Sequence, residues 1–301
     1  LQGMMAIKGI YAKHLITRMN HGIGFNTAAI ELLLPTYGEE LGLKGKICTN
    51  WVSNPIPAMI PAIETGWVKS VLAFGSELGM EDYVRERSDV FFTGVDGSLR
   101  SNRCYAQMAG MYGIDMFTGS TLQMDADGNS STVTKGRITG FGGAPNMGSN
   151  PHGRRHSSPA WNSMITNPSD PMAKGNKLVT QIVRTQTKAG PTFVEQLDAV
   201  EVGKQAGFAE PPVMIYGEDL THLITEVGLG YVYMGETPEE RRKIIAAVAG
   251  DTPVGHTITT KEINDLRAAG KVAFPEDLGI DPSEATRERL AAKNMKEITD
   301  W

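Results

Sequence analysis

The chain has 301 residues, of which 41% are hydrophobic and 21% charged, and its formal net charge at pH 7 is −5. These values are typical of a globular chain with one large domain, alone or with an addition. A net negative charge argues against a nucleic-acid-binding protein, and the sequence contains no apolar run of about 18 residues that would predict a membrane span.

The compartment is predicted from the N-terminus and the cysteines. Lys8 and Lys13 interrupt the early apolar residues, so no secretory signal is recognised. Cys48 and Cys104 have no Cys-x-x-Cys partner, which favours reduced thiols in a cytoplasmic protein. Because the chain begins with a leucine and ends on a tryptophan in a helical pattern, we expect it to be part of a longer protein.

Up to about residue 148, apolar runs of β type alternate with helical segments and glycine-rich connections. The expected strands are 68–74, 90–93, 114–123 and 135–141. The expected helices are 26–34, which begins with an Asn-Thr cap and ends sharply at Pro35, 57–65 and 102–111. This alternation indicates an α/β domain with a largely parallel sheet.

The remainder of the chain predicts an α+β extension that ends in charged helices. A polar loop at 148–158 is followed by expected short strands or turns at 177–184, 193–202 and 213–216, with a further strand in 221–234. Helices are expected at 238–249, 260–270 and 284–301.

The first motif is Asn-His-Gly-Ile-Gly-Phe at 20–25, between an apolar stretch and a helix. Gly22 and Gly24 at such a turn let backbone amides approach an anionic ligand at a helix N-terminus. Thr27 stands where a dinucleotide fingerprint requires a third glycine or alanine, so that class of site is not predicted. The alternative is a tight strand–helix turn without a ligand.

The second motif is Gly75-Ser-Glu77-Leu-Gly79, directly after an expected buried strand. Ligands of open α/β sheets bind outside the carboxyl ends of the strands, which makes Glu77 a candidate catalytic carboxylate. A solvent-facing loop glutamate is the alternative.

The third motif, 119–148, predicts a hairpin with Asp127-Gly128 at its tip, followed by a glycine-rich loop. The loop residues that we expect against a ligand, as oxyanion-binding backbone, are Gly142, Gly143, Ala144, Asn146 and Gly148. No Gly-Lys-Ser/Thr follows, so the loop is not a P-loop. A plain connection remains the alternative.

The fourth motif is His152-Gly-Arg-Arg-His156. The histidine spacing resembles a metal site, but no Glu or Cys in the loop completes it, so no metal is predicted. Arg154 and Arg155 suit a phosphate or carboxylate, and a solvated basic loop is the alternative.

Taken in order, these motifs resemble the second domain of the CoA-transferases that use a glutamate, as does His-Leu-Ile-Thr-Glu-Val-Gly-Leu-Gly-Tyr-Val-Tyr at 222–233. Residues 75–103 and 136–161 are more specifically similar to the malonate decarboxylase α-subunit family. The resemblance implies a CoA-transferase-like (NagB/RpiA-like) domain at 1–250, with a helical extension at 251–301.

The resemblance also implies an activity: exchange of malonate for acetate on the thioester of an acyl-carrier-protein subunit. It implies no permanently bound cofactor, because the carrier presents a dephospho-CoA-derived prosthetic group. The expected partners are that carrier and the other malonate decarboxylase subunits, where the malonyl thioester is decarboxylated.

Residue by residue, Glu77 corresponds to the family's glutamate, and Gly142 to Gly148 correspond to the loop against the thioester. Gly22, Gly24, Gly75 and Gly79 are expected to bind the same group. Leu78 replaces the family's asparagine, which leaves open a covalent glutamyl intermediate or a ternary complex. The alternative functions are a thioester hydrolase on the same fold and a non-catalytic subunit that docks the carrier.

Overall fold

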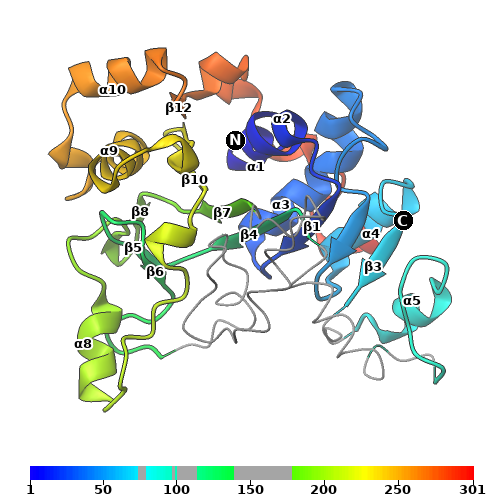
Figure 1. Ribbon diagram of the computed structural model, residues 1–301. Helices are drawn as coiled ribbons and strands as arrows, with labels where there is room; N and C mark the ends of the chain where they lie inside the picture. The colour runs from blue at the N-terminus through cyan, green and yellow to red at the C-terminus, as the bar shows by residue number, and fades with distance from the viewer. Residues whose placement is uncertain (74–78, 97–98, 100–113, 139–177) are drawn as a thin grey trace, which may run out of the picture.

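The computed structural model describes residues 1–73, 79–96, 99, 114–138 and 178–301 (Figure 1). In this part of the chain the centre is an eight-stranded sheet of order β12-β11-β10-β7-β4-β1-β2-β3. Its strands are β1 (Arg18–His21), β2 (Asn50–Val52), β3 (Ser70–Leu72), β4 (Met116–Ser120), β7 (Leu178–Ile182), β10 (His222–Ile224), β11 (Leu229–Gly230) and β12 (Val272–Ala273).

The strands from β3 across to β10 are parallel, and β11 and β12 complete the edge in antiparallel pairs. The central strands β4 and β7 are buried along almost their whole length, as continuous β-type runs in a parallel sheet are expected to be. The predicted α/β fold with a largely parallel sheet is therefore confirmed. If the six parallel strands are counted in chain order, β7 is the fifth and β10 the sixth. Their order across the sheet is then 3-2-1-4-5-6, the doubly wound order, and the direction of the order reverses between β1 and β4.

The largest hydrophobic core lies between the sheet and a layer of short N-terminal helices. These helices are α1 (Gln2–Ala6), η1 (Ile7–Tyr11), α2 (Ala12–His14), α3 (Phe25–Leu33), η2 (Leu34–Gly38), η3 (Pro57–Met59) and α4 (Ile60–Glu64). Side chains such as Met4, Ile7 and Ile30 are fully buried there, and α1 packs directly on α3.

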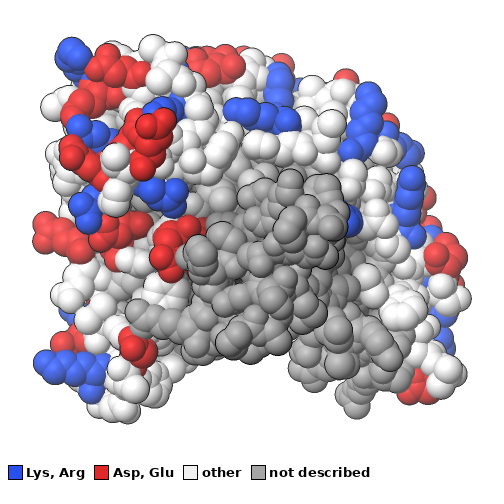
Figure 2. Space-filling view, in the orientation of Figure 1, with Lys and Arg blue, Asp and Glu red and all other residues white. Residues whose placement is uncertain are grey.

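A second core forms where α9 (Pro238–Val248) and α10 (Thr260–Ala268) pack at the β10-β11-β12 end of the sheet (Figure 1). Both helices begin where predicted, because Thr237 and Thr259 cap their first turns. On the face of the molecule in Figure 2, acidic and basic side chains are interspersed over these two helices rather than separated by sign.

The predicted hairpin is confirmed: β5 (Gln123–Met124) pairs with β6 (Ser130–Ser131), with Asp127 and Gly128 at the tip. The tip rests on η7 (Gly217–Asp219), where a Cβ added to Gly217 would lie 1.8 Å from the carbonyl oxygen of Asp127. Arg242 on α9 forms an ion pair with Asp127. The hairpin tip therefore packs directly against the backbone of Gly217.

The last segment of the chain returns to the N-terminal helices (Figure 1). The Ala291 N–H donates to the carbonyl of Leu32, Thr36 donates to the carbonyl of Arg289, and Lys8 Nζ lies 3.4 Å from the carbonyl oxygen of Gly279. Beyond residue 250 the chain also supplies β12 to the central sheet.

Two expectations about the helix at 26–34 are wrong. Its cap is Gly24, which has no side chain to accept a hydrogen bond, and the Thr27 hydroxyl donates back to the carbonyls of Gly22 and Gly24. Pro35 does not end the helix, which continues as the π-helix η2. A wider turn accommodates the proline ring and the missing N–H.

Other predicted boundaries also differ. Segment 193–202, expected as strand or turn, enters helix α8 (Asp198–Gln205), and segment 90–93 contributes only a bridge from Phe91 to Val71. The helix expected at 284–301 is broken into η11 (Pro282–Glu284), η12 (Arg287–Arg289) and α11 (Met295–Thr299). Asp281 caps the short turn η11, which ends at Glu284, and Asn294 caps a new turn inside the expected range, which interrupts a continuous helix. The helix expected at 102–111 lies outside the described residues.

The remaining elements of the described chain are short. They are α5 (Glu81–Glu86), β8 (Gln186–Thr187), β9 (Gly190–Pro191), η8 (Val232–Met234), η9 (Gly255–Thr257) and η10 (Pro275–Leu278). Among the described residues no helix has the length and apolar character to cross a membrane.

A pair of histidines packs at the amino ends of the strands. His14 Nε2 lies 3.2 Å from His222 Nε2, and His222 Nδ1 lies 2.9 Å from the hydroxyl of Thr221. Burial lowers the pKa of His222 well below 6.5, and the neighbouring His14 and Lys13 lower it further. Burial lowers the pKa of His14 as well.

Acidification is therefore expected to destabilise the protein. Unfolding restores the ordinary pKa of His222, so below about pH 6.5 the unfolded chain binds a proton that the folded chain does not. The free energy of unfolding should fall by up to about 1.4 kcal/mol per pH unit from this residue. Urea unfolding of wild type and His222→Gln between about pH 7.5 and about pH 5 measures it. Equal slopes for the two proteins would contradict the assignment.

Candidate active site

The reversal of strand order places the carboxyl ends of β1 and β4 next to each other. The Gly22 N–H, directly after β1, donates to the carbonyl of Thr118 at 2.8 Å. A Cβ added to Gly22 would lie 3.4 Å from the Cα of Gly119. The turn at 22–24 therefore lies directly against the end of β4, at the point where open α/β sheets bind their ligands.

Among the described residues, no side chain caps the N-terminus of α3. Gly24 is the cap residue, its φ of 169° is extended, and no described atom lies within 4 Å of the position that its Cβ would occupy. Backbone conformation thus does not require a glycine here; the glycine leaves space. The unpaired N–H groups of a first helical turn, with the helix dipole, favour an anion.

Side chains fix this turn to its surroundings. The Thr27 hydroxyl lies 2.5 Å from the carbonyl oxygen of Gly22 and 3.0 Å from that of Gly24. Asn26 Nδ2 donates to the hydroxyl of Ser120 at 3.1 Å, which joins the start of α3 to the end of β4. The turn is therefore held in place before any ligand binds.

The structure brings two of the predicted site residues, Gly22 and Gly24, to this point. Gly79 is also described, at a φ of +91°, and its N–H donates to Glu81 Oε2 at 2.9 Å at the entry to α5. The described contact of Gly79 is thus with the first residue of α5, the helix that follows the edge strand β3 in the chain. The other predicted site residues lie outside the described residues: Gly75, Glu77, Gly142, Gly143, Ala144, Asn146, Gly148, Arg154 and Arg155.

Sequence reasoning did not identify Gln181, which lies beside Gly119 in the register of β4 and β7. Gln181 is fully buried, and its Oε1 has no hydrogen-bond partner in the described part of the chain. Its Nε2 lies 3.5 Å from the position that a Gly119 Cβ would occupy. The signal was a lone amide within the apolar run Leu-Val-Thr-Gln-Ile-Val.

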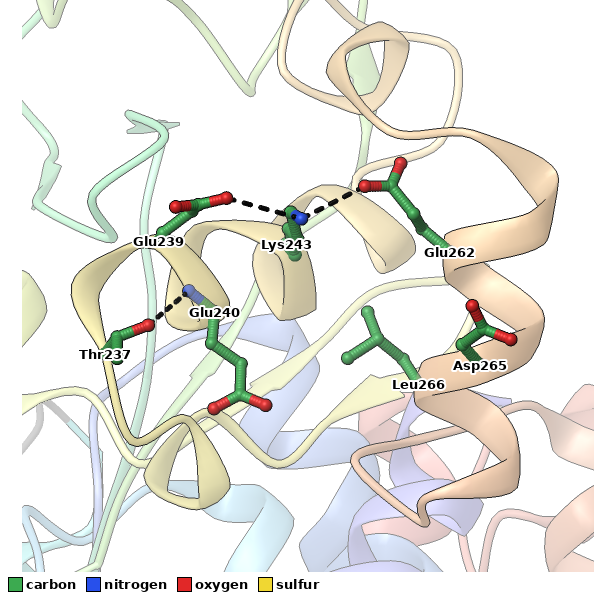
Figure 3. Close-up of a pocket in the computed structure, with 7 residues that line it drawn as sticks. All are labelled: Thr237, Glu239, Glu240, Lys243, Glu262, Asp265 and Leu266. Atoms are coloured by element: carbon green, nitrogen blue, oxygen red, sulfur yellow. Dashed lines mark hydrogen bonds and ion pairs between the residues drawn. The ribbon is translucent and has the colours of Figure 1, made fainter.

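A separate surface pocket of about 390 Å³ lies between α9 and α10 (Figure 3). Lys243 Nζ lies between the carboxylates of Glu239 and Glu262, at 3.3 and 3.1 Å. The other two acidic residues pair with different lysines: Asp265 with Lys261, and Glu240 with Lys271. These partners satisfy the acidic lining, and within the described ranges no group of His, Cys, Asp and Glu has the arrangement of a metal site.

Comparisons with known proteins cover the whole chain. A family model described as "Malonate decarboxylase, alpha subunit, transporter" matches residues 1–301. The chain is 54% identical, over its full length, to 55% of a protein from Malonomonas rubra named acetyl-S-ACP:malonate ACP transferase. This chain therefore spans about half the length of that curated relative.

Two solved structures agree with this result. One is a malonate decarboxylase α subunit from Acinetobacter baumannii, with 58% identity and a TM-score of 0.88 over 100% of this chain and 56% of that one. The other is a Pseudomonas malonate decarboxylase hetero-tetramer in complex with malonate, with 58% identity and a TM-score of 0.89 over 100% of this chain and 55% of that one.

Proposed function

Because the chain belongs to the malonate decarboxylase α-subunit family, we propose that it takes part in exchanging malonate for acetate on the thioester of an acyl carrier protein. The observation in the structure that carries the proposal is the uncapped turn at Gly22 and Gly24, placed where the strand order reverses. The Gly22 N–H is paired with Thr118, and the amides that follow it, at the start of α3, suit the oxyanion of a thioester under attack.

The proposed chemistry proceeds through Glu77. Its carboxylate attacks the acetyl carbonyl carbon, the C–S bond breaks, and a mixed anhydride and a thiolate form. The thiolate attacks the glutamyl carbonyl and acetate leaves. Malonate then attacks the glutamyl thioester, and the released thiolate takes the malonyl group from the new anhydride, which regenerates the Glu77 carboxylate. Direct exchange in a ternary complex remains the alternative.

Each attack produces a negatively charged oxygen that needs donors. A single oxyanion-hole donor is typically worth about 3–4 kcal/mol of barrier lowering. The proposed donors are the backbone amides at 23–24 and those of the loops 75–79 and 142–148. The N–H groups of Gly22 and Gly79 are already paired, with the carbonyl of Thr118 and the carboxylate of Glu81. Arg154 or Arg155 would hold the second carboxylate of malonate or a phosphate of the carrier's prosthetic group.

The finer assignments belong to the same proposal. The carrier would present a dephospho-CoA-derived thiol as the substrate, so that no cofactor of the chain itself is required. A CoA-transferase-like (NagB/RpiA-like) domain and CoA-transferase-type chemistry are part of the proposal, which rests on the motif resemblance. The domain would extend past residue 250, because β12 belongs to the central sheet. By similarity to the Pseudomonas hetero-tetramer, the chain would assemble with other malonate decarboxylase subunits.

The complete protein, given acetyl carrier protein and labelled malonate, is expected to form labelled malonyl carrier protein and free acetate in equal amounts. Acetate release that does not depend on malonate would indicate a hydrolase instead. Tight binding of the carrier without either reaction would indicate a docking subunit.

A further inference from the structure

A chain of buried hydrogen bonds joins four elements beneath the glycine turn. His21, the last residue of β1, places Nδ1 2.9 Å from Glu31 Oε1 on α3. Its Nε2 lies 2.7 Å from the hydroxyl of Tyr11 on η1, and that hydroxyl lies 2.9 Å from the hydroxyl of Thr118 on β4. All four side chains are buried, with His21 only 4% exposed.

The hydrogen-bond directions of this network are set by the carboxylate. Glu31 can only accept when ionised, so Nδ1 of His21 carries a hydrogen and donates to it. With a neutral imidazole, the Tyr11 hydroxyl donates to Nε2 and accepts from Thr118. Burial raises the pKa of Tyr11 well above its usual value, which keeps the phenol protonated as this arrangement requires.

The network connects directly to the turn that the proposed function uses. His21 immediately precedes Gly22, and Thr118, whose hydroxyl meets Tyr11, also accepts the Gly22 N–H through its carbonyl. One residue of β4 therefore holds the turn through its backbone and the network through its side chain. Any rotation of the His21 backbone would move the amides that follow it.

We propose that His21, oriented by Glu31 and Tyr11, is a positioning residue that fixes the turn after β1, so that the amides of residues 23 and 24 are held for the oxyanion. This inference rests on the proposed function. A misplacement of about 1 Å in a catalytic group costs on the order of a hundredfold in rate. A hydrogen-bond network that holds the turn in place should therefore affect turnover. Removing one partner of a buried His–Glu pair is itself strongly destabilising, so the positioning role is separated from a structural one by kcat of the folded variants and not by their stability.

The test compares Tyr11→Phe and His21→Leu with wild type in the complete protein, by kcat and KM for acetyl carrier protein and by thermal unfolding. Both variants remove a polar partner and keep an apolar side chain in the core. We expect kcat to fall about tenfold to a hundredfold while KM changes little, because the network positions the amides where charge develops in the transition state.

A matched control is His222→Gln, a second buried histidine on the same sheet at the opposite ends of the strands. It should lower the melting temperature and leave kcat near wild type. If the network variants lose stability and keep kcat, as the control does, the positioning role is wrong. If wild type exchanges nothing, the proposed function fails and this inference with it; an active wild type with unaffected variants overturns this inference alone.

Discussion

Glu77→Gln in the complete protein is expected to abolish exchange, with a loss of at least about a thousandfold, or ~4 kcal/mol of transition-state stabilisation. The amide keeps the size of the side chain and removes its charge and nucleophilicity. Labelled malonate incorporation into acetyl carrier protein measures the loss. Glu86→Gln, an exposed carboxylate in α5, is the matched control and should retain exchange.

Borohydride distinguishes the two mechanisms that the sequence left open. A glutamyl thioester would be reduced, so wild type should be inactivated by borohydride only after acetyl carrier protein, which carries the acyl thioester, has been added. A Gln variant with near wild-type exchange would rule out the covalent role of Glu77. An inactive variant beside a wild type that borohydride never traps would assign Glu77 to positioning reactants in a ternary complex.

Gly217→Ala is expected to be the most destabilising single-methyl change in the hairpin region. The added Cβ would overlap the carbonyl of Asp127. Because the atoms that it meets are backbone atoms of the hairpin, the hairpin tip has to move. We expect a loss of ~3 kcal/mol in the free energy of unfolding, the upper end for overpacking. Urea unfolding measures it. Glu218→Ala, in the same turn but exposed, should stay within about 0.5 kcal/mol of wild type.

The parts of the fold predicted from sequence were those specified by local pattern. The apolar runs that became β4 and β7 and the Asp127-Gly128 turn each carry their own signal over a few residues. Pro35 shows the limit of such local rules. A proline is expected to end a helix, but here the chain continues through Pro35 as the π-helix η2. The helix expected at 284–301 failed because the cap at Asn294, within it, was not weighed against its charge pattern.

The candidate site was predicted less completely. Its glycine turn was identified from the spacing of Gly22 and Gly24, since that signal is local. The network around His21 was not, because Tyr11, Glu31 and Thr118 become neighbours only through the register of β1 with β4 and the packing of two helices. Nothing in the spacing of these residues along the chain marks them as partners.

The contact between residues 272–301 and the helices near residue 32 has a consequence for folding. The Ala291 N–H is paired with Leu32, and β12 covers the edge of β11, so contacts that complete the core join residues far apart in the chain. Until residues 272–301 dock, the edge of β11 and part of the helical layer stay uncovered. Such long-range closure slows folding relative to local pairing. The partly folded chain therefore exposes an unpaired strand edge until this docking step is complete.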